Sequence, residues 1–119
     1  MNKINSYRDL IVWQKSMSLV TEIYSITRNF PPVELYGLAN QMRRSAISIP
    51  SNIAEGYGRN STGDYKRFLQ IAVGSLFELQ TQVEIAFNLD YITSELLKEL
   101  VDKTKELELM LLSLIRKIN

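Results

Sequence analysis

Apolar side chains recur along the chain at alternating steps of three and four residues, the spacing of a helix with one buried face. Four segments keep this pattern over several turns, and none alternates as a half-buried strand would. The stripes are Leu10, Trp13, Met17, Val20 and Tyr24; Ala39, Met42, Ala46, Ile49 and Ile53; Tyr65, Leu69, Ala72, Leu76, Leu79, Val83 and Ala86; and Leu97, Leu100, Thr104, Leu107, Leu111, Leu114 and Ile118. The sequence therefore predicts an all-α protein with four helices.

Polar and helix-breaking residues mark the ends of the predicted helices. Ser6 and Asp9 have the spacing of a capping box, the first helix should stop before Pro31, and the second should end around Gly58. The predicted starting residues are Ser6, Glu34, Ser61 and Thr93. Because the connections are short, consecutive helices should be antiparallel. We expect residues 1–119 to form one domain, an up-down-up-down antiparallel four-helix bundle.

A proline lies inside the second stripe. Pro50 has no amide hydrogen to donate to the carbonyl of Ala46, and its ring crowds the preceding turn. The sequence therefore predicts that the second helix is kinked near Pro50.

Composition removes several kinds of chemistry. The chain has no cysteine, which excludes disulfides and thiolate sites, and no histidine, the commonest general base and transition-metal ligand. No apolar run approaches the ~20 residues of a membrane-spanning helix, and no secretory leader is recognisable. We expect a cytoplasmic protein with no membrane contact, no metal and no cofactor.

The net charge of +1 conceals an uneven distribution. Residues 1–67 carry nine basic and five acidic side chains, whereas residues 68–119 carry five basic and eight acidic ones. The candidate nucleic-acid contacts are Arg43, Arg44, Arg59, Lys66 and Arg67, with Lys15 as a further candidate. Such cations bind phosphates without reading bases, and Tyr57 and Tyr65 could stack on unpaired bases. Ordinary solvation of helix surfaces would explain the same charges.

The remaining polar residues favour structure over catalysis. Glu55 and Glu78 resemble one carboxylate pair of a di-iron bundle, but the Glu-x-x-His motifs of such sites are missing, and no serine has a base partner. We expect a non-enzymatic protein in which Asn52, Glu55 and Glu78 form a structural polar network, with Arg43 or Arg44 pairing a carboxylate. Ligand binding by these residues is the alternative. Gly74 is expected to let two helices approach closely.

Two predicted helices carry apolar residues outside their stripes. These residues are Val12, Leu19, Ile23 and Ile26 in the first helix, and Phe68, Ile71, Val73, Phe77 and Phe87 in the third. A bundle needs only one apolar face per helix, so the surplus indicates either a wide core or self-association.

Several segments carry a family resemblance. Ser48-Ile49-Pro50-Ser51-Asn52-Ile53-Ala54-Glu55-Gly56 resembles the signature of four-helix bundle proteins encoded in intervening sequences of bacterial 23S ribosomal RNA genes. The accessory variability protein of diversity-generating retroelements is similar to that family. Residues 10–15, 41–46 and 71–76 match in the same order. The resemblance implies a homo-oligomer, in several relatives a pentameric ring, and partners that include RNA or a reverse transcriptase.

The sequence thus favours a non-enzymatic, oligomeric four-helix bundle that binds RNA or DNA through a basic surface as an accessory factor. The alternative is a structural or protein-interaction oligomer, for example a reverse transcriptase partner, that makes no direct contact with nucleic acid.

Overall fold

The computed structural model describes residues 3–118. It contains four long helices, α1 (Ile11–Thr27), α2 (Leu38–Tyr57), α3 (Thr62–Asn88) and α4 (Ser94–Lys117), and two short 3-10 helices, η1 (Tyr7–Asp9) and η2 (Pro32–Tyr36). No strand occurs in these residues, which confirms the predicted all-α fold with four helices. Over the same range, no helix is long and apolar enough to cross a membrane.

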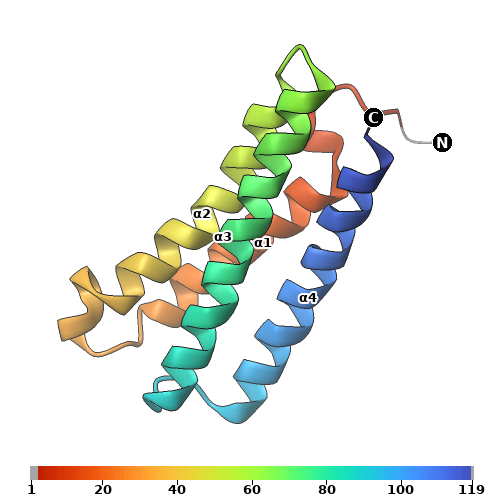
Figure 1. Ribbon diagram of the computed structural model, residues 1–119. Coiled ribbons are helices and arrows are strands. Elements are labelled where there is room, and N and C mark those ends of the chain that lie inside the picture. Colours follow the sequence, from red (N-terminus) through yellow and green to blue (C-terminus); the bar gives the residue numbers. More distant parts are fainter. Residues whose placement is uncertain (1–2, 119) are drawn as a thin grey trace.

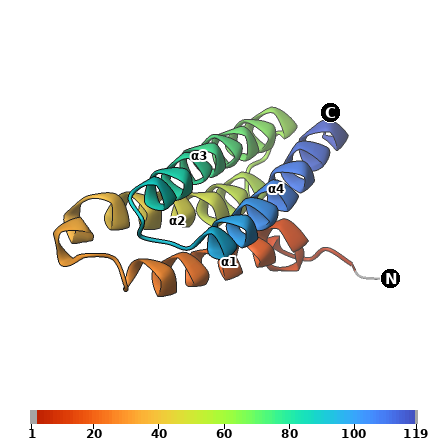
Figure 2. The same cartoon turned by 90° about the horizontal axis from the view of Figure 1, so that it is seen from below.

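The helices pack as a bundle with extents of 43 × 26 × 20 Å (Figures 1 and 2). α2 packs against α1 and α3, while α4 packs against α3 and α1. The α2–α3 contact is the most extensive and the α1–α4 contact the least extensive of these four. In Figure 1 the chain reverses direction from each helix to the next, so the α2–α3 turn lies at the same end as η1 and the last turn of α4. Pro50 is buried within the unbroken α2, and the predicted kink there stays a prediction.

Helix caps confirm two of the predicted starting points. The Ser61 hydroxyl accepts a hydrogen bond from the backbone N–H of Asp64, and the Thr93 hydroxyl accepts one from Leu96, each at 3.1 Å. The capping box of Ser6 and Asp9 is also present, but it caps η1, and α1 begins only at Ile11. The predicted start of the second helix at Glu34 is wrong, because Glu34 lies in η2 and α2 begins at Leu38.

The core confirms most of the predicted stripes. All five stripe residues of α2 are buried, as are those of α3 except the half-buried Tyr65. In α4 the central residues Leu100, Thr104, Leu107 and Leu111 are buried, while the outer three are half-buried against the core. These helices each present one dominant apolar face, so periodicity alone identifies the buried side.

The predicted stripe of α1 is wrong. The buried residues of α1 are Val12, Ser16, Leu19, Ile23 and Thr27, whereas Met17 is 42% exposed. Two of the buried positions are polar, and their hydroxyls donate to α1's own backbone: Ser16 to the Trp13 carbonyl at 2.8 Å and Thr27 to the Ile23 carbonyl at 2.7 Å. Burial therefore leaves neither hydroxyl unpaired. A search for apolar residues alone selects the wrong face of this helix.

A carboxylate clamp closes the end of the bundle opposite the α2–α3 turn. Glu34 Oε1 accepts the first free N–H of α2, from Leu38, at 2.9 Å, and Oε2 accepts the Tyr91 hydroxyl at 2.8 Å. The Tyr91 ring packs against Phe30 with 5.0 Å between centroids. The Leu38 hydrogen bond, followed by that of Tyr91, lowers the pKa of Glu34, and the same bond raises the pKa of Tyr91. The clamp joins the α1–α2 connection to the α3–α4 turn.

Two alanine substitutions in α1 test which face is buried. Ile23→Ala empties a fully buried site and should cost about 2–5 kcal/mol of unfolding free energy. Met17→Ala, at the 42% exposed position, should cost less than about 1 kcal/mol. Chemical denaturation at one protein concentration measures both, and a larger loss for Met17→Ala would restore the stripe expected from the sequence.

Acid titration tests the clamp. Since the pKa of Glu34 is lowered in the folded protein, its carboxylate stabilises the fold above the unfolded-state pKa of about 4, and this contribution is lost as the pH falls through the folded-state pKa. Glu34→Gln should therefore melt at a lower temperature than the wild type at pH 7, with a difference that shrinks towards pH 3. Tyr91→Phe removes one of the two donors and should show a smaller difference with the same trend. A difference independent of pH would rule out the carboxylate as its source.

Candidate functional site

Basic side chains gather at the end of the bundle that holds the α2–α3 turn. Arg59 follows α2, Lys66 and Arg67 lie in the first turns of α3, Arg8 lies in η1, and Arg116 and Lys117 lie in the last turn of α4. Figure 1 shows these four elements meeting at one end. We call this set of six residues the basic end.

Aromatic rings hold three of its arginines. The guanidinium groups of Arg59 and Arg67 each lie 4.8 Å from the centroid of Phe68. Arg8 lies 5.6 Å from the ring centroid of Tyr7 and 5.5 Å from that of Trp13. A guanidinium that stacks through its planar face keeps its in-plane N–H groups able to bind phosphate oxygens.

Gly56 explains why Phe68 is so closely held. A Cβ at this buried position of α2 would come within 2.7 Å of Phe68 Cβ and 3.2 Å of the Tyr65 carbonyl oxygen. Only glycine therefore lets the end of α2 pack directly on the first turns of α3. The ring that carries Arg59 and Arg67 is fixed by this contact.

The two tyrosines beside the turn contact each other. Tyr57 and Tyr65 are half-buried and pack edge to face with 6.1 Å between centroids. Burial, and then the proximity of Tyr57, raise the pKa of Tyr65, which keeps its hydroxyl protonated at neutral pH. Their stacking on bases stays a prediction.

The other three predicted contacts lie elsewhere. Arg43 is half-buried between α2 and α1: its guanidinium lies 4.8 Å from the Tyr24 centroid, and its Nε donates to the Thr27 hydroxyl at 2.8 Å. Lys15 pairs with Glu106 of α4 at 3.2 Å. Arg44 is exposed beside α3. The sequence missed Arg8, Arg116 and Lys117, although the predicted up-down topology places the end of the fourth helix beside the turn that follows the second.

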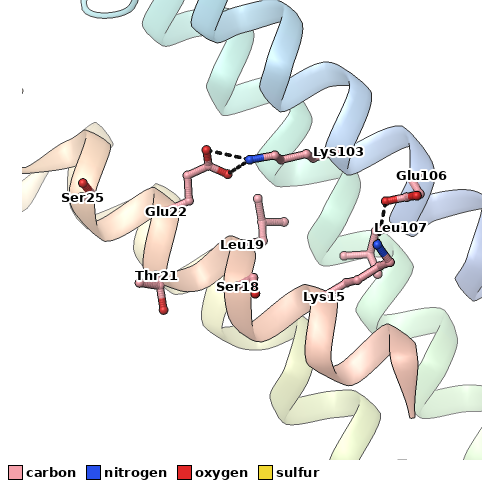
Figure 3. A pocket seen from close by; sticks show the side chains of 9 residues that line it. All are labelled: Lys15, Ser18, Leu19, Thr21, Glu22, Ser25, Lys103, Glu106 and Leu107. Atoms are coloured by element: carbon pink, nitrogen blue, oxygen red, sulfur yellow. Dashed lines mark hydrogen bonds and ion pairs between the residues drawn. The ribbon is translucent and has the colours of Figure 1, made fainter.

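A groove of about 480 Å³ separates α1 from α4 (Figure 3). Lys15 and Glu106 close one part of it, and Lys103 Nζ lies 3.0 Å from both carboxylate oxygens of Glu22 in another. Leu19 lies between these two pairs. Each cation is matched by an acid, so the groove offers no excess charge to a ligand. The pairs instead join the two helices that contact each other least.

The predicted polar network is divided into three parts. The Asn52 amide donates to the Ser48 carbonyl at 2.8 Å and to the Ser48 hydroxyl at 2.9 Å, and the Ser75 hydroxyl of α3 donates to the same Ser48 oxygen at 2.8 Å. Glu55 is exposed and pairs with Arg59, one turn away, at 2.9 Å. Within residues 3–118, Glu78 forms no ion pair. The expectation of one network is wrong, because Glu55 and Glu78 point to different surroundings.

Outside this chain of hydrogen bonds, the α2–α3 interface opens into a polar groove of about 330 Å³. Its lining residues are Gln41, Arg44, Ser45, Ser48, Ser75, Glu78 and Gln82. Over the described part of the chain, no three acidic side chains are grouped as metal ligands.

Isosteric substitutions separate the parts of the divided network. Asn52→Asp replaces the amide donor with an acceptor facing the Ser48 carbonyl, and should cost about 1–3 kcal/mol of unfolding free energy. Glu55→Gln alters only an exposed pair and should cost less than about 0.5 kcal/mol. Urea denaturation of both variants at pH 7 measures the two costs, and equal costs would mean that Asn52 does not join α2 to α3.

Comparison with known proteins agrees with the fold. The family model of the 23S rRNA-intervening sequence protein matches residues 8–113. A crystal structure of a protein of unknown function from the S23 ribosomal protein family of Bacteroides thetaiotaomicron superposes with a TM-score of 0.83 and 25% identity, over 89% of this chain and 96% of that one. Comparison with curated proteins gives no match. Since the family model spans almost the entire bundle, the chain belongs to the 23S rRNA-intervening sequence protein family.

Proposed function

We propose that the protein is a non-enzymatic, homo-oligomeric nucleic-acid-binding protein whose contact surface is the basic end. The observation that carries this proposal is the convergence of six cations from four elements. The nearby acids do not offset them: Asp9 accepts backbone N–H groups of Asn5 and Ser6, and Glu55 pairs with Arg59 alone. The end therefore retains an excess of positive charge.

The chemistry of the basic end favours binding to phosphates without base readout. Lys and Arg displace condensed counterions from nucleic acid, which gives affinity that depends steeply on salt. Three of the six cations are arginines held on aromatic rings, so less side-chain freedom is lost when they bind a phosphate. The name of the family refers to an insert in ribosomal RNA genes, and RNA is the first ligand to test.

Self-association would multiply a modest binding surface. Large apolar side chains remain exposed on the subunit, among them Phe77 at 45% and Leu109 at 56%. Burial of such groups between copies would bring several basic ends into one particle, and linked weak contacts give high avidity. A pentamer and an accessory role beside a reverse transcriptase are part of this proposal through the family resemblance.

Charge reversal tests the basic end. In Arg59→Glu/Arg67→Glu, affinity for a labelled single-stranded RNA should fall at least tenfold at 50 mM salt. The slope of log affinity against log salt should decrease in magnitude by about 2, one unit for each lost phosphate contact. Fluorescence anisotropy over a salt series measures both quantities.

A matched control reverses two cations at the opposite end of the bundle. Arg28 follows α1 and Lys98 begins α4, so Arg28→Glu/Lys98→Glu makes the same change in net charge away from the basic end. Light scattering should give wild-type mass for both double variants. Equal loss of affinity in both would show a response to net charge only, and wild-type binding after reversal of Arg59 and Arg67 would overturn the proposal.

A further inference from the structure

Gly74 has no structural role within its own subunit. It is exposed in the middle of α3, and a Cβ added there would meet no other atom within 4 Å. The expectation that it lets two helices of the bundle approach is therefore wrong. A glycine inside a helix costs about 1 kcal/mol relative to alanine. Nothing within residues 3–118 explains why this position should carry that cost.

Gln82 shows a second unexplained feature on the same helix. It is only 9% exposed and lines the polar groove, yet its Oε1 is buried without a hydrogen-bond partner. No other buried side-chain nitrogen or oxygen in residues 3–118 lacks a partner. An amide left in this state costs about 1–3 kcal/mol, and native proteins rarely leave one unpaired.

The two features lie on one face of α3. Ile71, Ser75, Glu78, Gln82 and Ile85 follow at steps of four and three, with Gly74 beside Ser75. Ile71 and Ile85 are 41% and 42% exposed at the two ends of this row. Across the groove α2 contributes mainly short or uncharged side chains, with Arg44 as its only cation. The middle of the groove is thus shallow and polar, and exposed apolar side chains flank it.

We propose that a helix of a second copy of this chain lies along the α2–α3 groove. Small residues at Gly74, Ser75 and Ser48 let a backbone approach closely, as a rod-like helix requires. The occupant would bury Ile71 and Ile85 and give the Gln82 amide a partner. This inference rests on the homo-oligomer proposed above and assigns it an interface.

The charges of the groove favour a copy over a polyanion. The groove carries one arginine and one glutamate, Arg44 and Glu78, and neither forms an ion pair within residues 3–118. The two charges cancel, so the groove lacks the excess of positive charge that attracts nucleic acid. A copy of the chain carries the complement of each charge.

Leucine at the open glycine tests the interface. In Gly74→Leu the added side chain has free space within the subunit, so the fold should be retained, but it would occupy the space of the docked helix. Gly63→Leu is the matched control, because Gly63 is also exposed on α3 and a Cβ there also meets nothing within 4 Å. At about 10 μM, light scattering after size-exclusion chromatography should show the oligomer for wild type and Gly63→Leu. Gly74→Leu should elute as a monomer with wild-type circular dichroism.

Each other result has a definite meaning. An oligomer of unchanged mass in Gly74→Leu would overturn this interface and leave the proposed homo-oligomer intact. A wild-type monomer would overturn the homo-oligomer itself, and the interface with it. Unchanged mass with lost RNA binding in Gly74→Leu would assign the groove to RNA and also overturn the inference.

Discussion

Close packing of α2 on α3 is the constraint on which the other features depend. Met42, Ala46, Ile49 and Ile53 of α2 are fully buried, as are Leu69, Ala72, Leu76 and Leu79 of α3. At one end of this contact, Gly56 admits Phe68, and Phe68 holds the arginines of the basic end. Along its outer edge, Ser48, Asn52 and Ser75 join the two helices beside the polar groove. Both candidate surfaces are therefore consequences of one interface.

The two surfaces differ in charge and in the partner they suit. The basic end is formed where the ends of several elements meet, and its cations outnumber the acids around them. The polar groove lies along the sides of two helices, and its single cation and single anion balance. This separation lets one subunit contact a copy of itself through the groove while its basic end remains accessible. An oligomer built in this way would display a repeated positive surface.

Sequence periodicity predicted the helices well wherever each had one apolar face. It failed for α1, because Ser16 and Thr27 are buried there and satisfy their hydroxyls on the helix backbone. It also placed the start of α2 too early, since Glu34 acts from a preceding 3-10 turn as an acceptor for Leu38. Polar contacts that stabilise a boundary are local in the sequence but leave no periodic pattern.

The candidate site was less predictable than the fold, because neighbours in sequence separate around a helix. Arg43 and Arg44 differ by about 100° in direction, so one packs on Tyr24 of α1 and the other borders α3. Arg8, Arg116 and Lys117 join Arg59 only through the topology of the bundle. An unpaired amide such as that of Gln82 depends on what surrounds it in three dimensions.

The shared position of Arg59 and Arg67 on Phe68 has a further consequence. Two like charges held against one ring repel each other, and the exposed ends of their side chains cannot move far apart without leaving it. An anion that bridges them removes this repulsion as it binds. The empty subunit thus stores electrostatic strain at the place where a phosphate would relieve it, and a more dilute electrolyte would increase that stored energy.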